Sequence, residues 1–256
     1  MSTSAARLNV VELPTPSDDA VTLARLEGWL PPLLSVIAGM VDLTGFFMLG
    51  NIFTAHITGN LVVVAAAILR GGPLNTAQAW AIPVAVAALA ASWVVARVSG
   101  RRGPALAELL LFVHFFLLCA LLVFSVLTKP SANPHGLMAG IAAMIAVCAM
   151  AVQYALFRLA IPASISTAVM TGNLTTAVLA LMDTLFPRHP LMANDATRLK
   201  RALQLLCGFL TGCAIAAAVL SSLKDWSWSV PVVLAGAACW FASTDPSHST
   251  PQRIIR

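Results

Sequence analysis

The sequence predicts an all-α integral membrane protein whose helices cross the bilayer several times. Apolar residues make up 59% of the 256 residues and charged residues only 10%, whereas a soluble domain averages about 45–50% apolar and about 25% charged residues. The mean hydropathy of +0.87 points the same way. So few charges cannot cover a water-facing surface, and we therefore expect lipid to cover much of the chain.

Eight apolar segments divide the chain, and each is expected to form a helix. A helix needs about 20 apolar residues to cross ~30 Å of hydrocarbon. The segments lie near 31–50, 51–69, 78–98, 105–128, 136–156, 166–186, 201–222 and 229–243. Only Gly50 and Asn51 join the first two, so one of them is a half-helix or the pair forms a tight hairpin or a broken helix. With a short last segment, this predicts six to eight spans.

The division into domains follows from the polar ends and from an internal repeat described below. We expect a polar N-terminal tail over 1–28 and a polar C-terminal tail over 244–256. Between them we expect two membrane repeats, over 29–130 and 131–243.

Two basic gaps bear on the topology. Arg97, Arg101 and Arg102 flank one gap, and four basic residues from Arg188 to Arg201 flank the other. Three segments separate the gaps, so complete spans would place them on opposite faces of the membrane. Basic loops favour the cytoplasmic face. If both gaps are cytoplasmic, one intervening segment does not cross fully, and we favour a re-entrant or broken segment; the orientation stays open.

The internal repeat is the strongest signal in the sequence. Thr54–Leu61 reads TAHITGNL and Thr167–Leu174 reads TAVMTGNL, so six of eight positions match at an offset of 113 residues. Four segments of separation would make the repeats parallel, whereas a broken segment between them would make them inverted. His56 matches Val169, so a polar site built from both copies would be asymmetric.

The Thr-Gly-Asn (TGN) tripeptide in each copy needs a physical reason inside a membrane. Glycine weakens a helix by about 1 kcal/mol relative to alanine, and a buried asparagine must find hydrogen-bond partners. Two interpretations remain open. The TGN elements allow continuous helices to pack closely, or each marks a helix break where freed backbone groups line a cavity, as in transporters built from repeats.

The sequence around the first TGN element resembles a known family. The run AGMVD at Ala38–Asp42, followed by Gly45-Phe46, Leu49-Gly50, Phe53, Ala55 and Thr58-Gly59-Asn60, resembles the YoaK family of bacterial multi-pass membrane proteins of unknown function. The stretch from Gln153 through Arg158, Pro162, Ser166-Thr167 and Thr171-Gly172 is similar to that family's second block. The resemblance covers roughly residues 30–240 and implies the bacterial cytoplasmic (inner) membrane, but no activity. His56 departs from the pattern, which has an amide or a small residue there more often.

Polar residues inside the apolar segments are the candidate functional residues. An aspartate at a helix centre costs about 2.5–3.5 kcal/mol on insertion scales. We therefore expect Asp42 to face the bundle interior near the first TGN element, either as a structural group or lining a path for a substrate or proton. Arg158 is a membrane-interface anchor or a counter-charge to Asp42. The candidate substrate-binding residues are Asp42, His56, Thr58, Asn60, Gln153, Thr171 and Asn173.

No catalytic motif accompanies these residues, so we expect no enzyme activity, no cofactor and no metal site. The net charge of +5 comes from short loops rather than a basic patch with exposed aromatics, which argues against nucleic acid. The expected partners are membrane lipids and an unknown small molecule or ion, and self-association stays open. We predict a transporter or channel with a polar site between the two TGN elements; the alternative is a membrane scaffold or regulatory interaction protein.

Overall fold

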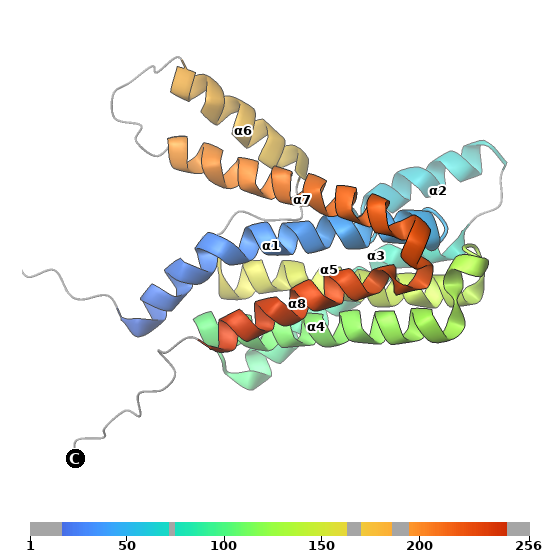
Figure 1. Cartoon of the computed structure of the whole chain (residues 1–256), viewed down its shortest axis with the longest axis horizontal. Helices are drawn as coiled ribbons and strands as arrows, with labels where there is room; N and C mark the ends of the chain where they lie inside the picture. The colour runs from blue at the N-terminus through green and yellow to red at the C-terminus, as the bar shows by residue number, and fades with distance from the viewer. Residues whose placement is uncertain (1–16, 72–74, 163–169, 186–194, 245–256) are drawn as a thin grey trace, which may run out of the picture.

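The computed structural model is an all-α bundle, as the sequence predicts, and it describes residues 17–71, 75–162, 170–185 and 195–244 (Figure 1). No β-strand occurs within these ranges. The elements are α1 (Asp18–Met48), α2 (Gly59–Leu69), α3 (Thr76–Ser99), α4 (Gly103–Thr128), the 3₁₀ helix η1 (Pro130–Ala132), α5 (Leu137–Ala160), α6 (Met170–Leu185), α7 (Asp195–Leu223), the 3₁₀ helix η2 (Lys224–Trp228) and α8 (Ser229–Ser243).

The first helix begins earlier than the sequence analysis expects. The Ser17 hydroxyl accepts a hydrogen bond from the Ala20 N–H, and two aspartates follow in the first turn, where negative charge favours the helix dipole. Thr22 and Leu26 are buried against the bundle. The polar tail expected over 1–28 is therefore helical from residue 18 onward, because the N-cap and these inward-facing side chains start the helix there.

Two helices are too short to cross a bilayer alone. The 11 residues of α2 and the 16 residues of α6 span about 16 and 24 Å at 1.5 Å per residue, against ~30 Å of hydrocarbon. Within the described ranges, five stretches are long and apolar enough to cross, the last of which contains both α7 and α8. In Figure 1 that last stretch folds back at η2, so α7 and α8 run in opposite directions.

The hydrophobic core is formed mainly by buried side chains of α1, α4, α5 and α8, and α7 packs closely against α1. Glycines allow α1 and α7 to approach at backbone distance, because a Cβ atom at Gly39 would overlap the Phe209 carbonyl oxygen and one at Gly212 would overlap that of Val36. Such close approach through small residues is typical of membrane helices. The Ser35 hydroxyl adds a 2.7 Å hydrogen bond across this contact to a carbonyl oxygen of α7.

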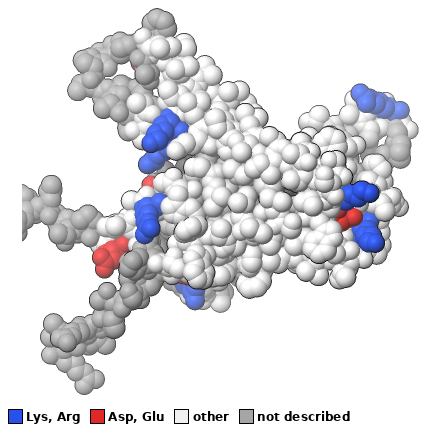
Figure 2. Space-filling view, in the orientation of Figure 1, with Lys and Arg blue, Asp and Glu red and all other residues white. Residues whose placement is uncertain are grey.

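Lys and Arg side chains gather at the two ends of the helices (Figure 2). The basic end is defined here as the end where α1 and α7 begin and α3 and α5 end. It carries Arg25, Arg97, Arg101, Arg102, Arg158, Arg198, Lys200 and Arg201, whereas Arg70, Lys129 and Lys224 lie towards the opposite end. The described basic residues of both gaps thus lie at the same end, with α4, α5 and the short helix α6 between them in the chain. Arg188 of the second gap lies outside the described residues.

Candidate functional site

The candidate site is built around a non-helical connector, residues 49–58, between α1 and α2. The chain turns at Gly50 and Asn51, whose φ angles of 77° and 59° are left-handed. Glycine adopts this conformation at no steric cost and asparagine at a small one. At Gly50 an added Cβ would also lie 2.6 Å from the Pro134 carbonyl oxygen. The first TGN element therefore follows a helix break, and the interpretation that requires one continuous helix over 51–69 is wrong.

The carboxylate of Asp42 holds this connector in place. Its Oδ1 atom accepts hydrogen bonds from the backbone N–H groups of Thr54 at 2.7 Å and Ala55 at 2.8 Å. Its Oδ2 atom lies 2.6 Å from Nδ1 of His56. The side chain is buried, with 5% of the residue exposed. Bonds of this kind to an ionised acceptor are about twice as strong as neutral ones, so they offset much of the cost of burying the charge.

The partner of Asp42 is His56 rather than Arg158. Arg158 is exposed near the end of α5, as the anchor interpretation of the sequence expects. The His56 side chain is 37% exposed, so it can reach the surroundings while Asp42 stays enclosed. Nδ1 contacts Asp42, which leaves Nε2 as the ring nitrogen available to a ligand.

The side chain of Asn60 closes the connector from its other end. Its Oδ1 atom accepts from the Phe53 N–H at 2.9 Å, and its Nδ2 atom donates to the carbonyl oxygens of Phe53 at 2.7 Å and Ile57 at 3.1 Å. Asn60 is fully buried. The first asparagine of the repeated TGN therefore satisfies backbone groups that the helix break leaves without helical partners.

The first turn of α2 is also satisfied internally. The backbone N–H groups of residues 59–61 each donate to the carbonyl oxygen three residues earlier, at 2.8 to 3.2 Å. The sequence analysis, by placing a helix break at the TGN element, led us to expect free N–H groups here. That expectation is wrong for α2, because the chain enters the helix through tight 3₁₀-type bonds.

Helices α5 and α7 complete the site. The Tyr154 hydroxyl of α5 donates a 2.5 Å hydrogen bond to the Ala55 carbonyl oxygen. The ring of Phe209 on α7 packs edge-on against His56, with centroids 5.2 Å apart. From the sequence, Tyr154 was considered together with Gln153 as a polar contribution of the second repeat but was not made a site residue, and Phe209 was not considered. The signal for Tyr154 was available, since it is the only tyrosine of the chain; nothing in the sequence singled out Phe209.

The other predicted site residues lie elsewhere. Gln153 is fully buried and donates to the Leu34 carbonyl oxygen, eight residues before Asp42 and thus about 12 Å away along α1. Thr58 is exposed at the start of α2, where its side chain makes no capping bond. The structure therefore brings Asp42, His56 and Asn60 together, but not Gln153.

The second TGN element lies in the first turn of α6, which packs against α7. Asn173 is buried like Asn60, and Thr171 is exposed like Thr58. Residues 163–169, which contain the start of the second repeat copy, lie outside the described residues. Figure 1 shows α2 and α6 diverging from the middle of the molecule towards opposite ends.

Chemically, the arrangement suits exchange of a proton or binding of a polar ligand or cation. A carboxylate bonded to an imidazole can share a proton with it, and histidine titrates near neutral pH when unperturbed. Within the described part of the chain, no group of three His, Cys, Asp or Glu residues could hold a metal ion.

Comparison with known proteins shows a match to one protein family and to one curated protein. Residues 30–241 match the family described as "Protein of unknown function (DUF1275)". A stretch of 48 residues is 44% identical to the UPF0700 transmembrane protein YoaK of Bacillus subtilis (strain 168), and it covers 19% of this chain and 21% of that protein. No solved structure matches the chain.

Proposed function

This chain belongs to the DUF1275 family and is an integral membrane protein, and we propose that it is a small-molecule or ion transporter or channel built from two inverted repeats. The observation that carries the proposal is the contact between the buried Asp42 and the partly exposed His56 at a helix break. Ionisable groups inside membrane bundles are costly and usually mark a path for a substrate, ion or proton. Non-helical backbone at membrane depth is tolerated where it lines a cavity or is buried in protein.

The helix contacts support the repeat. The offset of 113 residues carries α1, α2, α3 and α4 onto α5, α6, α7 and α8 in turn. Three contacts recur in both halves. Helix α1 packs against α7 and its equivalent α5 packs against α3, while α2 packs against α3 and its equivalent α6 packs against α7. Helix α4 packs against α5, and its equivalent α8 packs against α1. In Figure 1 the members of each equivalent pair run in opposite directions, the relation expected for inverted-topology repeats.

The charge distribution suggests an orientation. Lys and Arg favour cytoplasmic loops, so we place the basic end in the cytoplasm. The first and last described helices then both have their outer ends there. Access from the other face would pass through a cavity of about 460 Å³ beside the connector, lined by Gly50, Asn51, Asn75, Gln78 and His135 among others.

One observation favours the second candidate function, a membrane scaffold or regulatory interaction protein. The side chains of Asp42 and Asn60 are engaged with the protein's own backbone. A purely structural role for both would leave no ligand-binding site at the connector. The two functions differ in whether water reaches His56.

Thiol accessibility tests the proposal. In a variant of the full chain without its five cysteines, single cysteines would be placed over 51–62 and 164–175 and treated with a charged, membrane-impermeant thiol reagent. A transport path predicts reaction at His56→Cys. The control is Val62→Cys, whose side chain faces outward from α2 with 71% exposure and would be covered by lipid. Equal, negligible labelling at both positions would favour the scaffold.

A further inference from the structure

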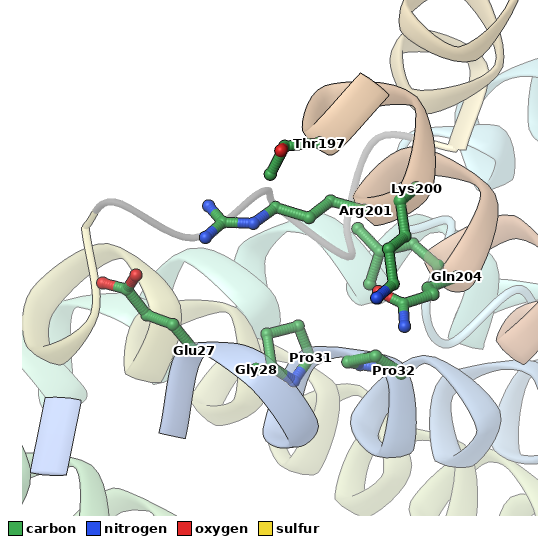
Figure 3. A pocket seen from close by; sticks show the side chains of 9 residues that line it. Glu27, Gly28, Pro31, Pro32, Thr197, Lys200, Arg201 and Gln204 are labelled. Atoms are coloured by element: carbon green, nitrogen blue, oxygen red, sulfur yellow. The ribbon is translucent and has the colours of Figure 1, made fainter. Parts of the chain in front are cut away.

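A second polar cavity opens at the basic end, between the first turns of α7 and the kinked part of α1 (Figure 3). Its volume is about 190 Å³. A Cβ atom added at Gly208 would lie 2.9 Å from the Pro32 carbonyl oxygen, whereas one at Gly28 would meet nothing within 4 Å. The two helices thus touch on the deep side of the cavity and separate towards the membrane surface.

The donors around this cavity match a phosphate group. Lys200, Arg201 and Gln204 enter it from α7, and Glu27 is the acidic side chain among its lining residues. In Figure 3 the Arg201 guanidinium extends over α1 towards Glu27, and Lys200 lies above Pro32. Among the described residues neither cation forms an ion pair. An arginine fork and a lysine point charge are common phosphate binders, and here they exceed the acidic charge by one.

An apolar groove continues from the cavity along α7. Ala196, Leu199, Leu203 and Cys207 line it together with Lys200 and Gln204, and its volume is about 430 Å³. The four apolar residues recur every three or four positions, so they share one face of the helix. Lys200 and Gln204 line both the cavity and the groove, so the cationic cavity and the apolar groove adjoin.

The prolines of α1 supply acceptors on the opposite wall. Pro31 and Pro32 lie inside the helix and lack the N–H groups that would bond to the carbonyl oxygens of Glu27 and Gly28. These two oxygens and the Glu27 carboxylate can accept hydrogen bonds from hydroxyl groups. A headgroup that carries both a phosphate and hydroxyls therefore fits the cavity better than a bare phosphate.

We propose that this cavity and groove form a binding site for one anionic phospholipid, with its phosphate between Lys200 and Arg201 and one acyl chain along the groove. Basic pockets between membrane helices on the cytoplasmic side are suited to anionic headgroups. A soluble phosphate compound shares the headgroup chemistry but would leave the groove empty. The site is separate from the Asp42–His56 site and does not depend on a transport function.

The test is native mass spectrometry of the full chain in detergent, with phosphatidylglycerol and phosphatidylcholine of the same acyl chains. We expect phosphatidylglycerol to stay bound under conditions that remove phosphatidylcholine. The double variant Lys200→Gln with Arg201→Gln should weaken phosphatidylglycerol binding by roughly 30-fold, from about fivefold per basic residue near an anionic surface. The matched control, Arg101→Gln with Arg102→Gln, removes the same charge from the same end and should bind as the wild type does.

Two further arms separate the sources of the phosphate. Soluble glycerol phosphate should not displace phosphatidylglycerol, and Leu203→Asn should weaken lipid binding while the basic residues remain. Equal retention of the two lipids by the wild-type protein would overturn the proposal, and this comparison needs no variant to fold. Equal losses of phosphatidylglycerol binding in the two double variants would overturn it as well. Displacement of phosphatidylglycerol by glycerol phosphate would overturn it in favour of a site for a soluble anion.

Discussion

Helices α1 and α5 hold equivalent places in the two proposed repeats, yet only α1 carries a charge in its interior. Asp42 of α1 matches Ala155 of α5 at the offset of 113 residues. Each helix packs against the third helix of the other half, α1 against α7 and α5 against α3. The same packing plan therefore accommodates a buried carboxylate in one half and a methyl group in the other.

The two contacts also differ in how closely the backbones approach. At the α1–α7 contact, added methyl groups would overlap backbone oxygens, whereas an added Cβ at Gly140 of α5 would lie 3.5 Å from the Ala77 Cβ of α3. A close contact fixes α1 relative to α7, and it places Phe209 against His56. The difference indicates that the first half is held rigidly where its polar connector needs support.

The largest effect is expected from replacing a glycine at the α1–α7 contact, the tighter of the two. Gly212→Ala would force the backbones of α1 and α7 apart, and we expect it to cost about 3 kcal/mol of stability or more. Its matched control is Gly140→Ala, which meets only ordinary van der Waals contact and should be neutral or stabilising by up to about 1 kcal/mol. Thermal unfolding in detergent measures both. Similar melting temperatures for the two variants would remove the distinction between the contacts.

The next effect concerns the charge that α1 alone carries. Asp42→Ala would leave the buried N–H groups of Thr54 and Ala55 without their acceptor, at a cost of about 2–4 kcal/mol. Asp42→Asn keeps an acceptor oxygen at the same place and should retain most of the stability. If thermal unfolding shows the two variants to be equally stable, Asp42 does not hold the connector as described.

A comparison of the two asparagines tests the equivalence of the repeats. Asn60→Leu removes three hydrogen bonds to the connector, and we expect a loss of about 2 kcal/mol. Asn173→Leu should give a similar loss if α6 begins as α2 does. Thermal unfolding of the two variants side by side measures this. A tolerated Asn173→Leu would mean that the second TGN element has a different role.

The smallest effect is expected at the link between the halves. Tyr154→Phe removes one hydrogen bond, from α5 to the Ala55 carbonyl oxygen, and should cost about 1 kcal/mol. Because the ring and its packing stay, a much larger loss would show that the hydroxyl does more than brace the connector. Labelling of His56→Cys in this background would then report whether the connector has moved.

Much of the fold follows from hydropathy, and less of the site does. The eight apolar segments correspond to eight helices in the described part of the chain, because lipid-facing and core residues are both apolar and extend over whole spans. The burial of Asp42 follows from the cost of exposing a carboxylate to lipid. Because only Gly50 and Asn51 join the first two apolar segments, the sequence also predicted a half-helix or a helix break at this point.

The partners inside the site could not be predicted, because they depend on how distant segments meet. Asp42 bonds to a connector that lies 12 to 14 residues further on. The sequence left Arg158 open as a membrane-interface anchor or a counter-charge to Asp42, and it did not identify His56 as the partner. Tyr154 and Phe209 come from helices whose packing the sequence does not specify. The hydrogen bonds of Asn60 could not be predicted because they depend on the position of the Phe53 backbone, which the turn after α1 determines.

The most direct test of the account is proton movement through the Asp42–His56 site. The full chain would be reconstituted in liposomes with a pH-sensitive dye inside, and a pH gradient would be applied with the membrane potential clamped. We expect proton-linked flux from the wild type, none from Asp42→Asn, and wild-type flux from Glu108→Gln, which neutralises a carboxylate outside the site. Flux from Asp42→Asn equal to that of the wild type, or a wild type indistinguishable from empty liposomes, would contradict a proton path through Asp42.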